Sequence, residues 1–203
     1  MKTFITILLL FLLRTLCYAQ TDSVWSTTDK EVKNKIQELR SKKIDTSVCY
    51  SVREGFIIPI VVADDSCRAR DIKYLCWTDN HQSYIQRFDE CKKFDPVMIT
   101  PSFSKLLTQN YSKIVKGKIK VPEYIAIVKG KKVLVAMDES DGSYTILEIH
   151  VGAKTIHKEI DDFDVQTKYV TGKHLNRNYV ANQISSLNRL RVLIEKEIKL
   201  HYQ

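Results

Sequence analysis

Two histidines and two glutamates fall within one stretch of chain that is predicted to form a β-hairpin. Gly152-Ala153, between two runs rich in β-branched residues, is typical of a two-residue hairpin loop. In that register Glu148 pairs with His157 and His150 pairs with Thr155. Because side chains alternate along a strand, one face then carries Leu147, Ile149, Ile156 and Ile160. The other face, here called the His–Glu face, carries Glu148, His150, His157 and Glu159.

Imidazole and carboxylate groups on one face could bind a divalent metal ion or act as general acid and base. The same pattern is also typical of the solvated side of a sheet that buries only its other side. The surrounding sequence supplies no nucleophile, oxyanion loop or recognisable third ligand, and the chain carries none of the familiar nucleotide-binding or hydrolase motifs. We therefore expect no cofactor and no metal, and keep a small metal-assisted hydrolase that uses the His–Glu face as the alternative function.

A lysine-rich segment dominates the charge distribution. Between residues 105 and 132 the chain has eight lysines and a single acidic residue, Glu123. Residues 138–164 then carry eight acidic residues against two lysines, so the two blocks would neutralise each other if they lay on neighbouring strands. The expected contact residues of the segment are Lys113, Lys116, Lys118, Lys120, Lys131 and Lys132.

Clustered lysines attract anionic polymers such as lipopolysaccharide or sulfated glycans, because like charges raise the local potential. Nucleic acid is disfavoured as a partner, since the segment has no arginine and only Tyr111 and Tyr124 to stack on bases. The opposing interpretation is a solvated face that protects exposed strand edges, for which lysine is commonly used. We expect a non-enzymatic binding module that contacts an anionic polymer or another exported protein through these lysines.

The first nineteen residues are typical of a secretory signal peptide. Lys2 precedes an apolar run at residues 4–13, and Cys17 and Ala19 occupy the small-residue positions before a cleavage site. The run is short for a membrane span, and no later segment approaches the roughly 20 apolar residues that spanning needs. We expect cleavage near Ala19, which leaves residues 20–203 as one soluble domain, secreted or periplasmic. The expected mature chain stays basic, with 30 of the 32 basic residues against 24 acidic ones.

The cysteines of the expected mature chain are Cys49, Cys67, Cys76 and Cys91. An even number in an exported protein is typical of two disulfides. No Cys-x-x-Cys occurs and no histidine has a suitable spacing to the cysteines, which disfavours a redox pair or a zinc site. A turn at Asp79-Asn80 would place Cys67 opposite Cys91. We therefore expect a Cys67–Cys91 bridge and, by elimination, a Cys49–Cys76 bridge.

Hydrophobic periodicity predicts an α+β fold for this chain of 203 residues, of which 44% are hydrophobic. That content excludes intrinsic disorder. Residues 29–42 are predicted to form a helix whose N-terminus is capped by Thr28 and Glu31. Short β-branched runs between residues 47 and 101 predict the strand-rich, disulfide-bearing half, and a short helix is expected from Ser102 to about Val115.

Four further strand-like runs, separated by turn signals, predict an antiparallel meander at residues 124–128, 133–137, 144–151 and 155–160. Residues 178–200 repeat apolar side chains every three or four positions, from Val180 and Ile184 to Ile198, which predicts a long helix. We expect an antiparallel sheet, made of the disulfide-bearing half and the meander, with the N-terminal helix and the long C-terminal helix packed on it.

Overall fold

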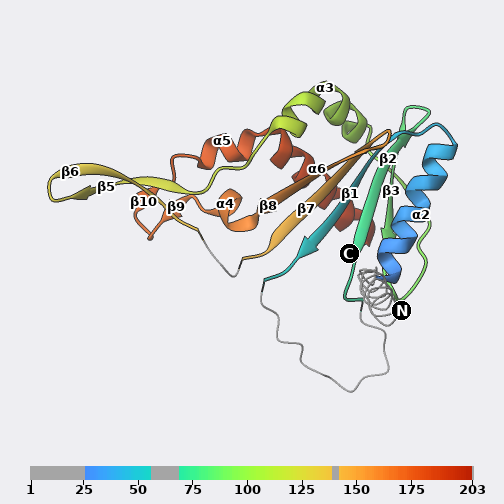
Figure 1. The fold of residues 1–203 in the computed structure, drawn as a ribbon, viewed down its shortest axis with the longest axis horizontal. Coiled ribbons are helices and arrows are strands. Elements are labelled where there is room, and N and C mark those ends of the chain that lie inside the picture. Colours follow the sequence, from blue (N-terminus) through green and yellow to red (C-terminus); the bar gives the residue numbers. More distant parts are fainter. Residues whose placement is uncertain (1–25, 56–68, 139–141, 203) are drawn as a thin grey trace, which may run out of the picture.

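The computed structural model describes residues 26–55, 69–138 and 142–202, and its main body is an antiparallel six-stranded sheet with helices on both faces (Figure 1). The strands of the sheet are β1 (Thr46–Arg53), β2 (Lys73–Asp79), β3 (Gln82–Phe88), β4 (Val97–Ile99), β7 (Tyr144–Val151) and β8 (Lys154–Asp161). Their order across the sheet is β4-β3-β2-β1-β7-β8. The predicted α+β fold is therefore confirmed. The expected signal peptide at residues 1–19 lies outside the described residues.

Helix α2 (Thr27–Ser41) packs on one face of the sheet. Its apolar side chains meet a cluster from β1, β2 and β3; the members are Val32, Ile36, Leu39, Cys49, Leu75, Trp77 and Phe88. Ser26 caps the helix, because its Oγ accepts a hydrogen bond from the backbone N–H of Asp29 at 3.0 Å. The predicted cap at Thr28 was wrong, since Thr28 is buried and its Oγ1 donates to the carbonyl of Asp71 at 3.1 Å instead.

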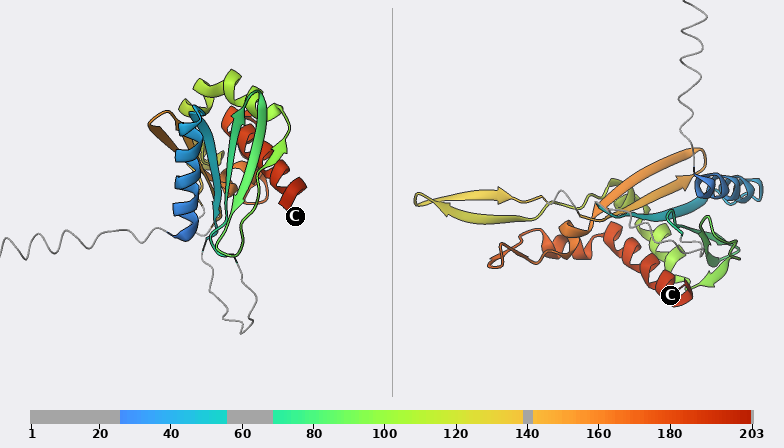
Figure 2. Two further views of the ribbon diagram at one scale, coloured as in Figure 1. Left: turned by 90° about the vertical axis from the view of Figure 1, so that its right-hand side faces the viewer. Right: turned by 90° about the horizontal axis from the view of Figure 1, so that it is seen from below.

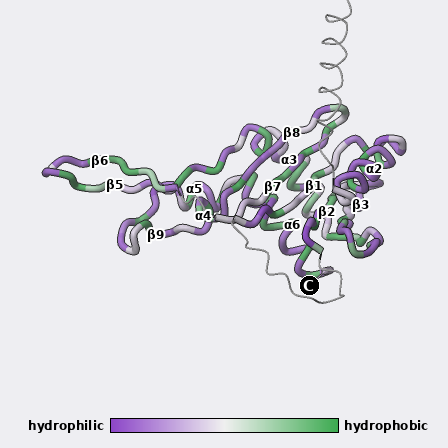
Figure 3. The backbone as a smooth tube through the Cα atoms, turned by 60° about the horizontal axis from the view of Figure 1, so that its bottom comes forward, coloured by the Kyte–Doolittle hydropathy of each residue, from purple (hydrophilic) through white to green (hydrophobic). Residues whose placement is uncertain are grey.

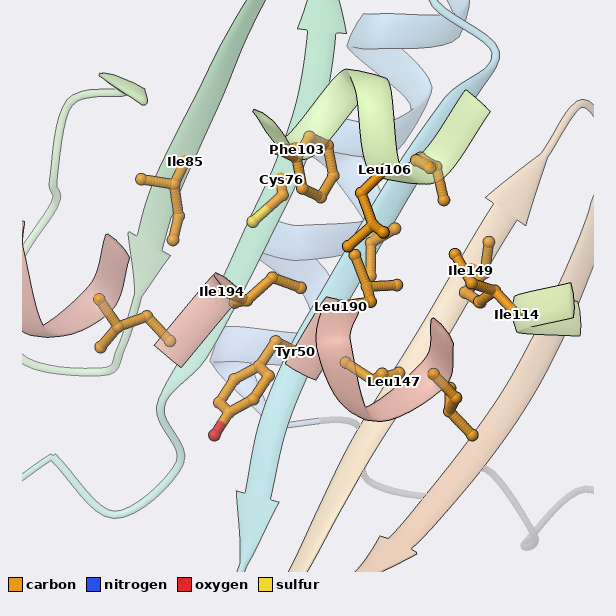
Figure 4. Packing of buried hydrophobic residues seen from close by; sticks show 14 of the residues in the cluster. Tyr50, Cys76, Ile85, Phe103, Leu106, Ile114, Leu147, Ile149, Leu190 and Ile194 are labelled. Atoms are coloured by element: carbon orange, nitrogen blue, oxygen red, sulfur yellow. The ribbon is translucent and has the colours of Figure 1, made fainter. Parts of the chain in front are cut away.

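The larger core lies on the opposite face, under helices α3 (Ser102–Lys116) and α6 (Ser186–Tyr202). Figure 2 shows the sheet between α2 on one side and α6 on the other. Figure 4 shows side chains from both helices meeting those of β1, β2 and β7; the labelled members include Tyr50, Cys76, Phe103, Leu106, Leu147, Leu190 and Ile194. Apolar burial on both sides of one sheet holds this body together.

The predicted long C-terminal helix is two helices, α5 (Tyr179–Ile184) and α6. The chain turns at Ser185, whose backbone is extended and whose Oγ accepts from the N–H of Asn188 at 3.2 Å, so Ser185 satisfies a donor of the first turn of α6. Val180 and Ile184, which were expected in the core, are exposed on α5. None of the described helices combines the length and apolar character that crossing a membrane requires.

The predicted four-stranded meander was wrong. Strands β5 (Glu123–Val128) and β6 (Lys131–Ala136) form a separate two-stranded ribbon, here called the arm, which projects away from the main body (Figures 1 and 2). Strand β7 pairs with β1 instead of β6. The arm has apolar side chains on both faces, so it lacks the alternation of a strand that buries one side only. Three short elements lie near its base, α4 (Asp162–Gln166), β9 (Tyr169–Val170) and β10 (His174–Leu175).

The predicted Cys49–Cys76 bridge was wrong, because both residues are buried free thiols. Val48 lies opposite Cys76 and Cys49 lies opposite Leu75, so the two cysteine side chains point to opposite faces of the sheet. Cys49 packs in the cluster under α2, and Cys76 packs in the core under α3 and α6. Cys91 is not among these free thiols, and Cys67 lies outside the described residues, so the Cys67–Cys91 bridge stays a prediction.

Candidate functional site

Four of the predicted contact lysines lie at the end of α3 and in the connection that follows it. Lys113 and Lys116 belong to the last turn of the helix. Beyond the helix Lys118 and Lys120 are exposed, whereas Ile119 between them packs against the core. Because Ile119 points into the core, the side chains of Lys118 and Lys120 on either side of it point into solvent.

The structure adds a fifth lysine that the sequence had placed in the acidic block. Lys158 of β8 donates a hydrogen bond from Nζ to the backbone carbonyl oxygen of Gly117 at 3.0 Å. Burial lowers the pKa of Lys158, and the positive charge of Lys118 lowers it further. The surface formed by Lys113, Lys116, Lys118, Lys120 and Lys158 is here called the lysine patch.

Gly117 is needed where α3 ends. A Cβ atom at this position would lie 2.5 Å from the carbonyl oxygen of Lys113, closer than real side chains approach backbone oxygen. The φ angle of Gly117 is −63°, so the requirement comes from this close approach and not from a left-handed backbone. The glycine lets the chain leave the helix abruptly and carry Lys118 and Lys120 along the surface.

Buried asparagines hold the connection between α3 and the arm in place. Asn182, which is 1% exposed, accepts from the N–H of Lys120 at 3.0 Å and donates to the carbonyl oxygens of Lys120 at 2.7 Å and Asp164 at 3.0 Å. Asn176 accepts from the N–H of Glu123 at 3.1 Å. Sequence reasoning missed this role, although asparagine is a poor helix former and Asn182 lay inside a predicted helix.

In the described part of the chain, no lysine of the lysine-rich segment forms an ion pair with the acidic block. Two acidic residues of that block pair with arginines instead: Glu159 with Arg53 at 2.6 Å, and Asp162 with Arg191 at 2.6 Å. Within residues 26–55, 69–138 and 142–202, no ion pair involves any of the eight lysines between residues 105 and 132. The lysine patch is therefore not neutralised by the described carboxylates.

The remaining two predicted contact lysines, Lys131 and Lys132, lie at the tip of the arm beside the turn at Gly130. The tip is the part of the arm furthest from the main body (Figure 1). The six predicted contact residues thus form two separate groups, four in the lysine patch and two at the arm tip.

The predicted hairpin register of the His–Glu face is confirmed, because Glu148 lies opposite His157 and His150 lies opposite Thr155. The carboxylate of Glu148 is 3.8 Å from His157 Nδ1 and 3.9 Å from His150 Nε2, and Glu159 is 3.9 Å from His157 Nε2. His150 is buried, with its Nδ1 3.0 Å from the hydroxyl oxygen of Thr155. Burial lowers the pKa of His150, which favours the neutral imidazole.

The arrangement offers little to catalysis. Among the described residues, no group of three histidine, cysteine or acidic side chains is placed to hold a metal ion. The thiol of Cys49, opposite Glu148 on the neighbouring strand, is no nucleophile at neutral pH, since burial and the charge of Glu148 raise its pKa to about 12. The metal-assisted alternative gains no support from this geometry.

Two hollows in the surface lie away from both the lysine patch and the His–Glu face. One of about 430 Å³ lies between α2 and residues 92–95, and another of about 530 Å³ adjoins it beside the end of α6. Neither is lined by a residue of the lysine patch or of the His–Glu face. The candidate binding surface is a charged face whose lysines Lys113, Lys116, Lys118 and Lys120 are exposed.

No protein-family model, curated protein or solved structure matches this chain. The functional argument therefore rests on the chemistry and placement of its own residues.

Proposed function

We propose that this protein is an exported, non-enzymatic binding module that contacts an anionic polymer through the lysine patch. The observation that supports it is the gathering of five lysines from α3, the connection after it and β8. Among the described residues, the lysines of α3 and of the connection have no acidic partner. Burial lowers the pKa of Lys158 and repulsion from Lys118 lowers it further, and an anion bound between the two lysines would relieve that repulsion.

Stabilisation of the helix accounts for only part of the patch. Lys113 and Lys116 in the last turn of α3 interact favourably with the negative end of the helix dipole, as does Lys158 through its bond to Gly117. Lys118 and Lys120 lie beyond the helix and point into solvent, where that interaction falls away. Their exposure without counter-charges favours a binding role.

Lysine suits a polymer that is recognised by charge. An ammonium group is a compact point charge on a flexible stem, whereas arginine forms planar, paired hydrogen bonds with carboxylate or phosphate. A patch made only of lysines therefore fits a repeating anionic chain, such as a sulfated glycan, better than one defined anionic group. Binding of this kind weakens steeply as salt screens the charges.

Retention on immobilised heparin, at low salt followed by a salt gradient, tests the proposal. The test variant reverses three exposed lysines of the patch, namely Lys116→Glu, Lys118→Glu and Lys120→Glu. A control with the same change in net charge reverses three exposed lysines elsewhere, namely Lys30→Glu, Lys173→Glu and Lys199→Glu. We expect the patch variant to elute at clearly lower salt than both the control and the unmodified protein.

Equal elution of the patch variant and the control would overturn the proposal, because net charge alone would then explain retention. Unchanged elution of the patch variant would overturn it as well. Far-ultraviolet circular dichroism checks that the variants keep the fold. A milder set with glutamine at the same three patch positions covers the case in which the glutamates disturb the end of α3.

A further inference from the structure

The arm exposes apolar side chains on both of its faces. Residues directly opposite each other share a face, so Ile125 and Leu134 lie on one face and Ala126 and Val133 lie on the other. Ile127 is 75% exposed and Leu134 is 54% exposed. A two-stranded ribbon by itself is only marginally stable in water, so an arm of this kind is expected to gain stability from a partner.

No described strand pairs with the outer edge of β6. Met137 N–H donates to the carbonyl of Pro122 at 2.9 Å, so these two residues form a hydrogen-bonded pair of the ribbon. Hydrogen-bonded pairs alternate with non-hydrogen-bonded pairs along an antiparallel ribbon, so every second pair towards the tip is hydrogen-bonded as well. The backbone groups of Lys132, Leu134 and Ala136 consequently point away from β5, and no partner for them is found among the described residues. Such an edge is a template for another strand.

The outer edge of β5 is partly covered at its base. Glu123 N–H donates to the side-chain oxygen of Asn176 at 3.1 Å, and the carbonyl of Glu123 accepts from the N–H of Arg177 at 2.8 Å. A partner strand on this side would have to displace the segment that carries Asn176 and Arg177. The edge of β6 is therefore the more accessible of the two.

The two ends of β6 carry opposite charges. Lys129, Lys131 and Lys132 surround the turn at the tip. Asp138 follows β6 at the base, near Asp161 and Asp164; burial raises the pKa of both of these carboxyls, and the charge of Asp138 raises it further. Two arms that lie antiparallel would bring each tip to the base of the other, whereas parallel arms would set lysines against lysines.

We propose that the arm pairs with the arm of a second copy of this chain, β6 against β6, antiparallel about a two-fold axis at Leu134. With this register Leu134 lies opposite Leu134 of the second copy, and Lys132 lies opposite its Ala136. All three outward-pointing positions of each strand are then hydrogen-bonded, which no other two-fold register achieves. Gly130 lies opposite Asp138 of the second copy, so the tip lysines flank that carboxylate.

Exposed apolar residues are concentrated on the arm and near its base. Fourteen large hydrophobic residues are exposed in the described parts of the chain, and ten of them fall within residues 121–134 and 169–184. The second range contains β9, β10 and α5, which lie near the base of the arm (Figures 1 and 2). Figure 3 shows hydrophobic stretches along β5 and β6 and a hydrophilic tip.

This inference goes beyond the proposed function, since it uses the arm and leaves the lysine patch free. Sedimentation equilibrium tests it with two charge variants, the tip variant Lys131→Glu with Lys132→Glu and the base variant Asp138→Lys. The unmodified protein is expected to dimerise. Each variant alone places like charges at both tip-to-base contacts, so its dimer should weaken by about tenfold or more. A one-to-one mixture restores opposite charges at both contacts and should regain the affinity of the unmodified dimer.

A proline pair identifies the edge. Leu134→Pro removes an N–H that points away from the arm and leaves the hydrogen bonds within the ribbon intact, so it should abolish the dimer. Ile125→Pro does the same on the outer edge of β5, directly opposite, and should leave the dimer unchanged. A protein that stays monomeric at every concentration overturns the inference. So does a dimer that ignores Leu134→Pro, or a variant mixture that fails to recover.

Discussion

Lys158 and Gly117 are joined by a hydrogen bond of 3.0 Å, from the ammonium group of a strand residue to the carbonyl oxygen at the end of a helix. The bond ties β8 to the end of α3, where burial lowers the pKa of Lys158 and the nearby charge of Lys118 lowers it further. The lysine patch is therefore assembled from two segments about 40 residues apart in the chain. The lysine-rich segment of the sequence therefore contains only part of the patch, because it lacks Lys158.

Replacement of Lys158 by methionine should weaken retention on heparin. The change removes one charge and the hydrogen bond to Gly117, and it keeps most of the aliphatic stem. Loss of that bond should cost about 1 kcal/mol in the free energy of unfolding. Elution salt measures the first effect and urea unfolding the second. Lys154→Met, on the same strand and exposed, is the control, and identical elution of the two variants would contradict the role given to Lys158.

Gly117→Ala should destabilise the protein. The added Cβ would lie 2.5 Å from the carbonyl oxygen of Lys113, so the end of α3 must shift to accommodate it. Forced contacts of this kind typically cost roughly 1–3 kcal/mol. Thermal unfolding gives the measurement, and an unchanged Tm would show that the helix ends differently from the structure.

Asn182→Ala should destabilise the protein more than Asn178→Ala does. Asn182 is buried and satisfies backbone groups of both Lys120 and Asp164, so its loss leaves buried polar groups unpaired, at roughly 1–3 kcal/mol. Asn178 donates a single hydrogen bond to the carbonyl of Val121 at an exposed site, where water replaces it. Urea unfolding of the two variants provides the comparison. Equal losses would mean that burial of Asn182 does not matter.

Asp164→Asn should stabilise the protein at neutral pH. Burial, and then the charges of Asp161 and Asp138, raise the pKa of Asp164 to about 6, above its ordinary value of 3.8. The folded protein therefore holds this proton to a higher pH than the unfolded chain does, and stability falls as pH rises from about 4 through 6. Asparagine cannot ionise, so the gain should be small near pH 4 and reach at most about 3 kcal/mol above pH 7.

Unfolding free energies measured at several pH values across that range check this prediction. The difference between Asp164→Asn and the unmodified protein must grow as pH rises. A difference that is constant with pH, or one that shrinks, would show that the Asp164 carboxyl titrates normally in the folded state.

Local signals predicted the local structure well. The hairpin of β7 and β8, with Glu148 opposite His157, followed from a two-residue loop and strict alternation along both strands. Helix α3 begins at the predicted Ser102 and ends one residue after the predicted Val115. Both features depend on residues that are close together in the chain.

Pairings between segments that are distant in the chain could not be predicted from the sequence. The hairpins of β5–β6 and β7–β8 look alike in sequence, yet only the second joins the sheet, because β1 pairs with β7 across about 100 residues. The Cys49–Cys76 prediction failed for a related reason. Elimination ignores which face a cysteine occupies, and that depends on the register between β1 and β2. Lys158 was missed because nothing local indicates that β8 lies beside the end of α3.

Backbone amide NMR spectra, recorded while a sulfated oligosaccharide is added, test the lysine patch as a binding surface most directly. We expect chemical-shift changes centred on Lys116, Lys118, Lys120 and Lys158, which diminish as salt is raised. The region around His150 and the outer surface of α2 should stay unchanged. Shifts centred on those regions, or no shifts at low salt, would contradict the assignment of this surface.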